Sequence, residues 1–255
     1  MSNSFYNSNS NFFNNSNNHK GNNTMKNSYG YNNNDLDTMN PAPRCPVTLL
    51  LDTSSSMYGQ PIQELNAALC QFIKETSEDE AASMSVELEV ITFDDAANIV
   101  LPFTPISNVR RNSVQLNAYG MTSMGAALGL AKTELENRRR MYRNSGISSY
   151  RPWVILMTDG GPNDNWTATA DQMRKLAEAG KITYIGIEIG NYADHATMCQ
   201  ILPAQPGPVK LQGLKFKQFF KWLTDSLKSI SSSAVSDQDN VKLGSIRSWA
   251  DLAGI

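Results

Sequence analysis

Three small polar side chains follow an apolar run near the start of the non-repetitive part of the chain. Asp52, Ser54 and Ser56 come directly after residues 47–51. Alternate residues of an extended segment point to one side, so one carboxylate and two hydroxyls can face a common point. This set has no thiolate and no imidazole, and it therefore suits a hard cation such as Mg²⁺ or Mn²⁺ and suits Zn²⁺ or Cu²⁺ poorly. The alternative interpretation is a capped helix start, in which Ser54 or Ser56 bonds free amides.

Two other segments carry oxygen side chains that could join this group. Thr122 lies in a glycine-flanked loop before a predicted helix, and Asp159 follows the apolar run 153–157. Both apolar runs have the length of strands buried on both faces of a sheet. In parallel α/β sheets the carboxyl ends of the strands meet at one edge, where ligands bind. The candidate metal ligands are therefore Asp52, Ser54, Ser56, Thr122 and Asp159.

Strands and helices alternate between residues 44 and 233, which predicts a doubly wound, mostly parallel α/β sheet. The predicted strands are 47–51, 84–93, 97–103, 152–158, 182–189 and 209–211. The predicted helices are 61–73, 126–143, 167–179, 194–202 and 215–231. The tight turn at Asp94 and Asp95 makes the second and third strands antiparallel. We therefore expect a six-stranded sheet with one antiparallel edge strand.

The two ends of the chain differ from this middle part. Residues 1–43 are rich in Asn, lack apolar periodicity and are predicted to be a disordered tail. Scattered aromatic residues give this tail a composition typical of self-associating segments, and a passive solubilising tail is the alternative. Residues 234–255 are predicted to be a linker followed by a short amphipathic peptide over 241–255, with one apolar helical face. That face consists of Ile246, Trp249, Ala250, Leu252 and Ala253. It either docks to a larger assembly or covers the protein's own domain.

Composition argues against several classes of function. The formal net charge of −2 predicts no nucleic-acid partner, and no apolar run reaches the ~18 residues of a membrane span. No secretory signal is recognised. The three cysteines are far apart, as expected for reduced cytoplasmic thiols, and only two histidines are present. The basic run 138–140 is expected to lie on a solvated helix face.

The spacing Asp-x-Ser-x-Ser after a hydrophobic strand resembles the metal-ion-dependent adhesion site of von Willebrand factor A (VWA) domains. The resemblance covers about residues 44–233 and implies a VWA/Rossmann-like fold. It implies that Ser54 and Ser56 bind the metal directly and that Thr122 binds it directly or through water. Asp52 and Asp159 would mainly accept hydrogen bonds from bound waters and hydroxyls. The resemblance further implies a protein-binding module, not an enzyme, whose under-neutralised metal captures an Asp or Glu of a partner.

Two further segments resemble the bacterial tellurium-resistance-associated, TerY-like branch of this family. These are residues 138–159 and residues 210–223. The resemblance implies a cytoplasmic protein of a stress-response or phage-defence system, with a possible kinase or phosphatase partner. The loop 120–125 departs from the family pattern, because Met121 and Ser123 replace a Gly and a Pro.

An enzymatic alternative comes from the same strand end. Asp52 after a hydrophobic strand also resembles the nucleophile of haloacid-dehalogenase-like, Mg²⁺-dependent phosphotransferases, with Thr92 and Asp159 as possible helpers. Those enzymes usually have a second Asp two residues on, which acts as the general acid, and this chain has Ser54 there.

Overall fold

The structure, a computed structural model, describes residues 36–251, and those from Thr38 onward belong to one compact unit. A seven-stranded sheet runs through this part, in the order β3-β2-β1-β4-β5-β6-β7. The strands are β1 (Cys45–Asp52), β2 (Val86–Phe93), β3 (Ala97–Pro105), β4 (Trp153–Thr158), β5 (Thr183–Glu188), β6 (Pro208–Leu211) and β7 (Ala250–Asp251). The pairs from β2 to β6 are parallel, and β3 is antiparallel to β2. The predicted sheet with its antiparallel edge strand is confirmed, and the two-residue strand β7 extends it beyond β6.

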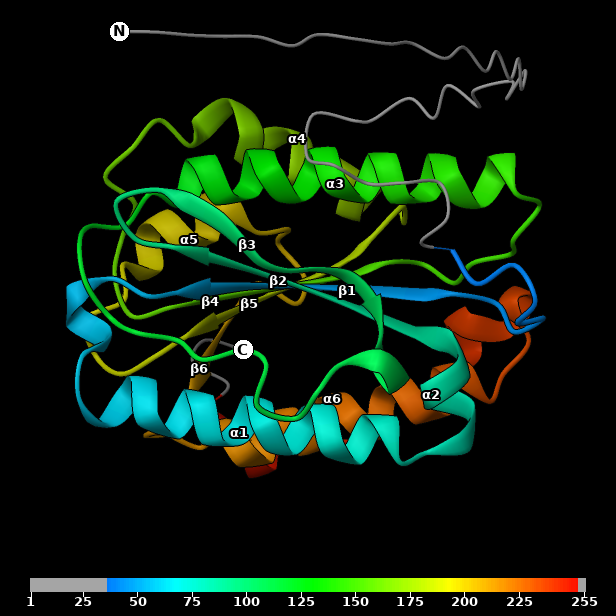
Figure 1. The fold of residues 1–255 in the computed structure, drawn as a ribbon. Coiled ribbons are helices and arrows are strands. Elements are labelled where there is room, and N and C mark those ends of the chain that lie inside the picture. The colour runs from blue at the N-terminus through cyan, green and yellow to red at the C-terminus, as the bar shows by residue number, and fades with distance from the viewer. Residues whose placement is uncertain (1–35, 252–255) are drawn as a thin grey trace, which may run out of the picture. The chain divides into compact units, whose positions relative to one another are not determined.

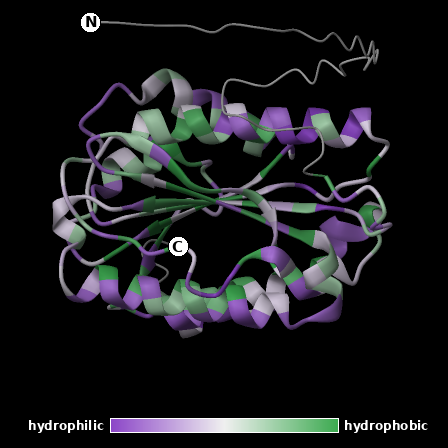
Figure 2. Cartoon of the chain, viewed as in Figure 1, coloured by the Kyte–Doolittle hydropathy of each residue, from purple (hydrophilic) through white to green (hydrophobic). Residues whose placement is uncertain are grey.

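Helices cover both faces of the sheet (Figure 1). One face is covered by α1 (Gln60–Ser77), α2 (Glu80–Ser85) and α6 (Phe216–Ser231). The other face is covered by α3 (Met124–Asn144), α4 (Thr167–Glu178) and α5 (His195–Ile201). Short 3-10 turns lie at Ser55–Met57, Ile106–Asn108, Val235–Asn240 and Ile246–Ser248. All eight residues of β1 are buried, as expected for a strand between two helical layers. Figure 2 shows the hydrophobic strands between helices whose outer surfaces are largely hydrophilic.

A buried group of charged side chains lies between α3 and the strands β1 and β2. Arg138 donates from Nε to Glu87 at 2.6 Å, and Tyr142 also donates to that carboxylate. The expectation that Arg138 is solvated is therefore wrong, since it is only 2% exposed. Glu89 is also buried; its Oε2 accepts a hydrogen bond from Thr48 Oγ1 at 2.9 Å, and its Oε1 has no partner among the described residues. Burial raises the pKa of Glu89 to about 8.

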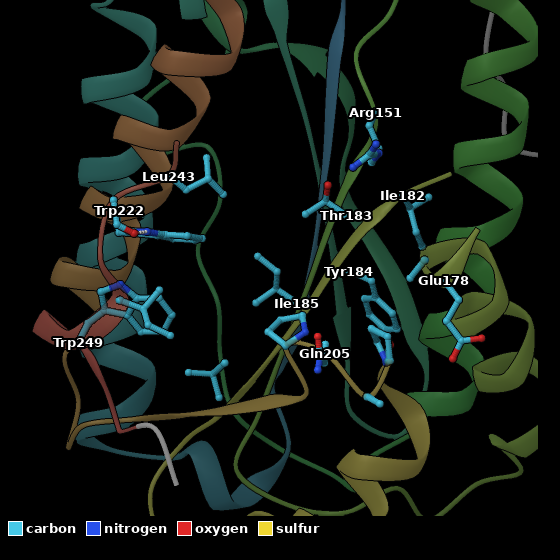
Figure 3. A pocket seen from close by; sticks show the side chains of 17 residues that line it. Arg151, Glu178, Ile182, Thr183, Tyr184, Ile185, Gln205, Trp222, Leu243 and Trp249 are labelled. Atoms are coloured by element: carbon cyan, nitrogen blue, oxygen red, sulfur yellow. Dashed lines mark hydrogen bonds between the residues drawn. The ribbon is translucent and has the colours of Figure 1, made fainter. Parts of the chain in front are cut away.

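The C-terminal segment packs on the domain itself. Trp249 is 1% exposed, and its ring lies 5.0 Å from that of Phe219 and 5.4 Å from that of Trp222. The predicted amphipathic helix is wrong within the described residues, because a 3-10 turn leads into β7 there; Leu252 and Ala253 lie outside them. The apolar side chain of Trp249 is thus covered by the protein's own domain, and it is not free for a larger assembly. Figure 3 shows Trp222 and Trp249 on one wall of a cavity of about 800 Å³ that reaches β5.

Ordered contacts also begin before residue 44. The side chain of Asn40 donates to the carbonyl of Met84 at 2.8 Å, and Ala42 N donates back to Asn40 at 2.9 Å. The disordered tail of residues 1–43 stays a prediction, although Asn40 near its end contacts Met84 of the domain. Residues 1–35 of this tail lie outside the described residues. None of the helices between residues 36 and 251 has the length and apolarity that a membrane crossing requires.

Replacing Glu89 tests the buried charged group. Its pKa is raised from 4.5 to about 8 in the folded state, so the folded protein binds this proton more tightly than the unfolded chain. The associated stability is present at acid pH and is lost as pH rises through about 8. Relative to Glu89→Gln, the wild type should lose up to about 1.4 kcal/mol of unfolding free energy per pH unit between these values. Urea unfolding at several pH values measures this difference, and equal slopes in the two proteins would contradict it. Glu178→Gln, at an exposed position, is the control.

Replacing Trp249 tests the packing of the C-terminal segment. Trp249→Ala should lower the free energy of unfolding by about 3 kcal/mol, because a large buried ring is removed from contact with two others. Denaturant unfolding measures the change. Tyr192→Ala, at a side chain that is 91% exposed, should leave stability nearly unchanged. A Trp249 variant as stable as the Tyr192 variant would show that the segment does not pack on the domain.

Candidate metal centre

A buried carboxylate joins the carboxyl ends of two neighbouring strands. Strands β1 and β4 are parallel and in register up to Leu51 and Met157, so the residues that follow each strand begin side by side. Asp52 Oδ2 accepts a hydrogen bond from Thr158 Oγ1 at 2.6 Å. Asp52 Oδ1 accepts from the backbone amide of Ser54 at 2.8 Å. Both oxygens of this fully buried carboxylate are therefore held, and the loop after β1 turns over it.

The two serine hydroxyls and the second carboxylate form a continuous group beside Asp52. Ser54 Oγ and Ser56 Oγ lie 3.0 Å apart, and Ser56 Oγ donates to Asp159 Oδ1 at 2.6 Å. Ser54 is buried, whereas Ser56 is exposed, so the group opens to solvent at Ser56. Ser54 makes no side-chain cap at the 3-10 turn that follows it. The capped-helix interpretation of these serines is therefore wrong, because their hydroxyls bond each other and Asp159 and do not cap the turn.

Thr122 reaches the same edge on a separate loop. Its backbone amide donates to Asn163 Oδ1 at 2.9 Å, and it is 8% exposed. A Cβ atom built on Gly160 would lie 4.0 Å from Thr122 Oγ1. The threonine hydroxyl thus lies beside the loop that carries Asp159. Hydrogen bonds thus join the segments of Ser54, Ser56 and Asp159, and Thr122 lies beside Gly160; that these residues together bind a metal stays a prediction.

The turn between β2 and β3 holds the loop of Thr122 in place. Gly120 has a φ of +72°, and a Cβ there would lie 2.6 Å from Asp95 Cγ, so only glycine fits. Asp95 Oδ1 accepts from the amide of Met121 at 2.9 Å, and the carbonyl of Gly120 accepts from the amide of Ser55 at 3.1 Å. Neighbouring Asp94 accepts from Thr53 Oγ1 at 3.0 Å. The sequence identified these two aspartates only as a turn.

The loop after β4 contributes residues that sequence reasoning missed. Asp164 accepts hydrogen bonds from the amides of Gly125 and Ala126, each at 2.8 Å, and so caps the start of α3. Its neighbour Asn163 binds the amide of Thr122. Asp164 is of the residue type that caps helices, and it stands just before α4. Its position in the sequence would predict a cap on α4. The hydrogen bond instead comes from Gly125 on α3, 39 residues earlier in the sequence.

The electrostatics of the site favour a bound cation. Burial raises the pKa of Asp52 to about 6, against the hydrogen bonds from Ser54 and Thr158, and the charge of Asp159 adds to the increase. Burial also raises the pKa of Asp159, against the hydrogen bond from Ser56. Within residues 36–251 no three His, Cys, Asp or Glu side chains gather as a metal site. A cation here would be held by hydroxyl oxygens, with these two carboxylates as acceptors for the hydroxyls and bound waters, and oxygen donors of this kind fit a hard divalent ion.

Comparisons with known proteins identify a family model and solved structures of similar fold. The family model described as von Willebrand factor type A domain matches residues 47–241. A von Willebrand factor type A protein from Catenulispora acidiphila is 18% identical with a TM-score of 0.57, covering 73% of this chain and 43% of that one. Proximal thread matrix protein 1 of the mussel byssus, solved with a zinc-occupied MIDAS motif, is 18% identical with a TM-score of 0.54, covering 74% and 46%. Manganese-loaded TRAP protein of Plasmodium vivax is 21% identical with a TM-score of 0.51, covering 71% and 73%.

These likenesses have defined limits. The chain spans less than half the length of the first two structures, and at these identities the superpositions show the fold. No curated protein matches the sequence. The mussel structure holds zinc in its MIDAS motif, so the expectation that such a ligand set suits zinc poorly does not hold for that protein.

Replacing Asp164 tests the link between the loop after β4 and helix α3. Asp164→Ala removes the acceptor of two helix amides and should lower the free energy of unfolding by about 1 kcal/mol. Thermal or urea unfolding measures the change. Asn165→Ala, at the exposed neighbouring position, is the matched control. Equal stability of the two variants would contradict the capping role.

Proposed function

The chain belongs to the von Willebrand factor type A domain family, and we propose that it is a metal-dependent protein-binding module. The observation that carries the proposal is the chain of contacts from Asp52 through the two serine hydroxyls to Asp159, with Ser54 Oγ 3.0 Å from Ser56 Oγ and the latter 2.6 Å from Asp159 Oδ1. This group opens to solvent at Ser56. A ligand bound there can therefore be reached by a second protein.

Each residue has a distinct role in this proposal. Ser54 and Ser56 bind Mg²⁺ or Mn²⁺ directly, and Thr122 binds it directly or through water. Asp52 and Asp159 hold the hydroxyls and bound waters in place through hydrogen bonds. The cation, when bound, supplies a positive charge that hydroxyl ligands do not neutralise. An Asp or Glu side chain of a partner protein can then complete the coordination, and this is the adhesive contact.

The phosphotransferase alternative has less support. A nucleophilic aspartate must present a free oxygen to a phosphate, whereas both oxygens of Asp52 accept hydrogen bonds and the side chain is fully buried. Thr92 is buried on β2, and Asp159 already accepts from Ser56. Ser54 stands where such an enzyme carries its general acid. We therefore propose a binding function without catalysis.

A finer placement rests on the sequence alone. Residues 138–159 and 210–223 resemble the tellurium-resistance-associated, TerY-like branch. On that basis we propose a cytoplasmic protein of a bacterial stress-response, tellurium-resistance or phage-defence system. Its partner in that setting would present an acidic side chain, and a kinase or phosphatase of the same system is the proposed candidate.

Titration calorimetry with Mg²⁺ and with Mn²⁺ tests the metal site. Asp52→Ala and Ser54→Ala should each weaken metal binding by at least about tenfold, because each removes a contact that binds or orients a ligand. Ser55→Ala is the matched control. Its hydroxyl lies between the two candidate serines in sequence, yet it donates to the carbonyl of Gly120 at 3.0 Å. Circular dichroism confirms that each variant is folded.

The partner is tested by affinity capture in Mg²⁺ and in EDTA. Proteins retained by the wild type in Mg²⁺ should be lost both in EDTA and with Asp52→Ala, and they should be kept by Ser55→Ala. Capture that survives both EDTA and Asp52→Ala would exclude the metal bridge. Metal binding that is unchanged in Asp52→Ala and Ser54→Ala would exclude the site itself.

A further inference from the structure

A second group of reactive side chains comes from the end of β5 and from α5; Figure 1 shows these two elements. His195 Nδ1 lies 2.8 Å from Glu188 Oε1. On the other side of the ring, His195 Nε2 lies 3.5 Å from Cys199 Sγ. Glu188 is the last residue of β5, whereas the histidine and the cysteine are one helical turn apart on α5. A thiol, an imidazole and a carboxylate are thus connected in one line.

Burial and exposure suit these three groups to different roles. The Glu188 side chain is 6% exposed, whereas that of His195 is 57% exposed, and Cys199 is exposed. The buried carboxylate fixes the ring through Nδ1, which leaves Nε2 directed at the sulfur. A nucleophile beside a base that a third group orients is the arrangement of an activated nucleophile.

We propose that Cys199 is an activated thiol and a site of reversible mixed-disulfide formation, with His195 as its base and Glu188 as the residue that positions the base. The co-reactant is a small, solvent-accessible disulfide. The thiol proton moves to His195 Nε2 while Cys199 Sγ attacks one sulfur of the disulfide. The disulfide bond breaks, and the departing thiolate takes the proton from His195. Cys199 is oxidised to the mixed disulfide, and half of the reagent is reduced to a thiol.

The need for a base follows from the surroundings of the sulfur. Partial burial and the charge of Glu188 raise the pKa of the Cys199 thiol, so without His195 its thiolate fraction would be small. A general base that takes the proton during the attack removes this disadvantage. The carboxylate of Glu188, which is unfavourable to a thiolate, stabilises the imidazolium that the transfer creates. The three residues therefore act together. Replacing His195 removes the base, and replacing Glu188 removes the charge that stabilises its imidazolium.

The chain supplies two internal references for reactivity. Cys70 is partly exposed and donates from Sγ to Asn112 Oδ1 at 3.3 Å, whereas the one histidine within residues 36–251, His195, lies beside Cys199. Cys45 is buried, and its burial raises its thiol pKa to about 12. Cys199 should therefore react fastest, Cys70 more slowly, and Cys45 only after unfolding.

The experiment uses the full chain and 5,5′-dithiobis(2-nitrobenzoate) as the disulfide. Release of the coloured thiol gives the rates, and mass spectrometry of peptides assigns them to each cysteine. Cys70→Ser isolates the reaction of Cys199. We expect Cys199 to react at least about tenfold faster than Cys70, a modest value for general-base assistance. His195→Asn should remove this advantage, and EDTA should not affect it.

The role of Glu188 needs a readout that a purely structural effect would not give. Glu188→Gln keeps an acceptor for the Nδ1 hydrogen bond but removes the charge, so it should slow Cys199 while leaving the rate of Cys70 unchanged. Glu188→Asp, which keeps the charge, should restore part of the rate. The proposal is overturned if Cys199 reacts no faster than Cys70, or if His195→Asn leaves its rate unchanged. EDTA removes a divalent metal and leaves the thiol unchanged. The EDTA arm therefore distinguishes failure of the metal site from failure of the thiol site.

Discussion

The hydrogen bond between Thr158 and Asp52 is the constraint on which the rest of the metal centre depends. A carboxylate without solvent contact is costly unless both of its oxygens are satisfied, and here the hydroxyl of Thr158 and the amide of Ser54 satisfy them. The contact from Thr158 fastens the end of β1 to the end of β4, and the contact from Ser54 holds the loop after β1 over the carboxylate. The loops that carry the serines and Asp159 therefore start from fixed points. Their side chains meet because the strand ends meet.

The third loop is held by different means, since no strand ends at Thr122. Asp95, Asn163 and Asp164 bind its backbone and the first amides of α3. Gly120 lets that loop pass against Asp95. Polar contacts to the backbone, and not an apolar core, thus set the position of the threonine hydroxyl. Such contacts can hold a small hydroxyl side chain near the surface in a fixed position.

The metal centre and the thiol group of Cys199 lie at the same edge of the sheet and differ in chemistry. The metal centre uses hydroxyls and carboxylates at the ends of β1 and β4, whereas the thiol group stands at the end of β5 and on α5. They are linked by the loop after β4, because the amide of Asp194 at the start of α5 lies 3.5 Å from the carbonyl of Gly160. The carboxyl edge of a parallel sheet places successive loops side by side. One edge can therefore carry both an oxygen-lined site and a thiol.

Local sequence patterns predicted six of the seven strands and five of the six α-helices that the described residues form, and they proposed five candidate ligands whose binding of a metal stays a prediction. The apolar run 47–51 predicts a buried strand. The alternate spacing of Asp52, Ser54 and Ser56 predicts that their side chains point to one side. Both patterns lie within a few residues of sequence. They were not sufficient where the partner lies far along the chain. The basic run predicts a solvated Arg138, whereas this side chain binds Glu87 beneath α3. Asp164 caps a helix that precedes it in sequence. Trp249 packs against the rings of Phe219 and Trp222 on α6, and the chain continues directly into a seventh strand, β7. In each case the deciding contacts join residues far apart in the sequence, which only the tertiary structure brings together.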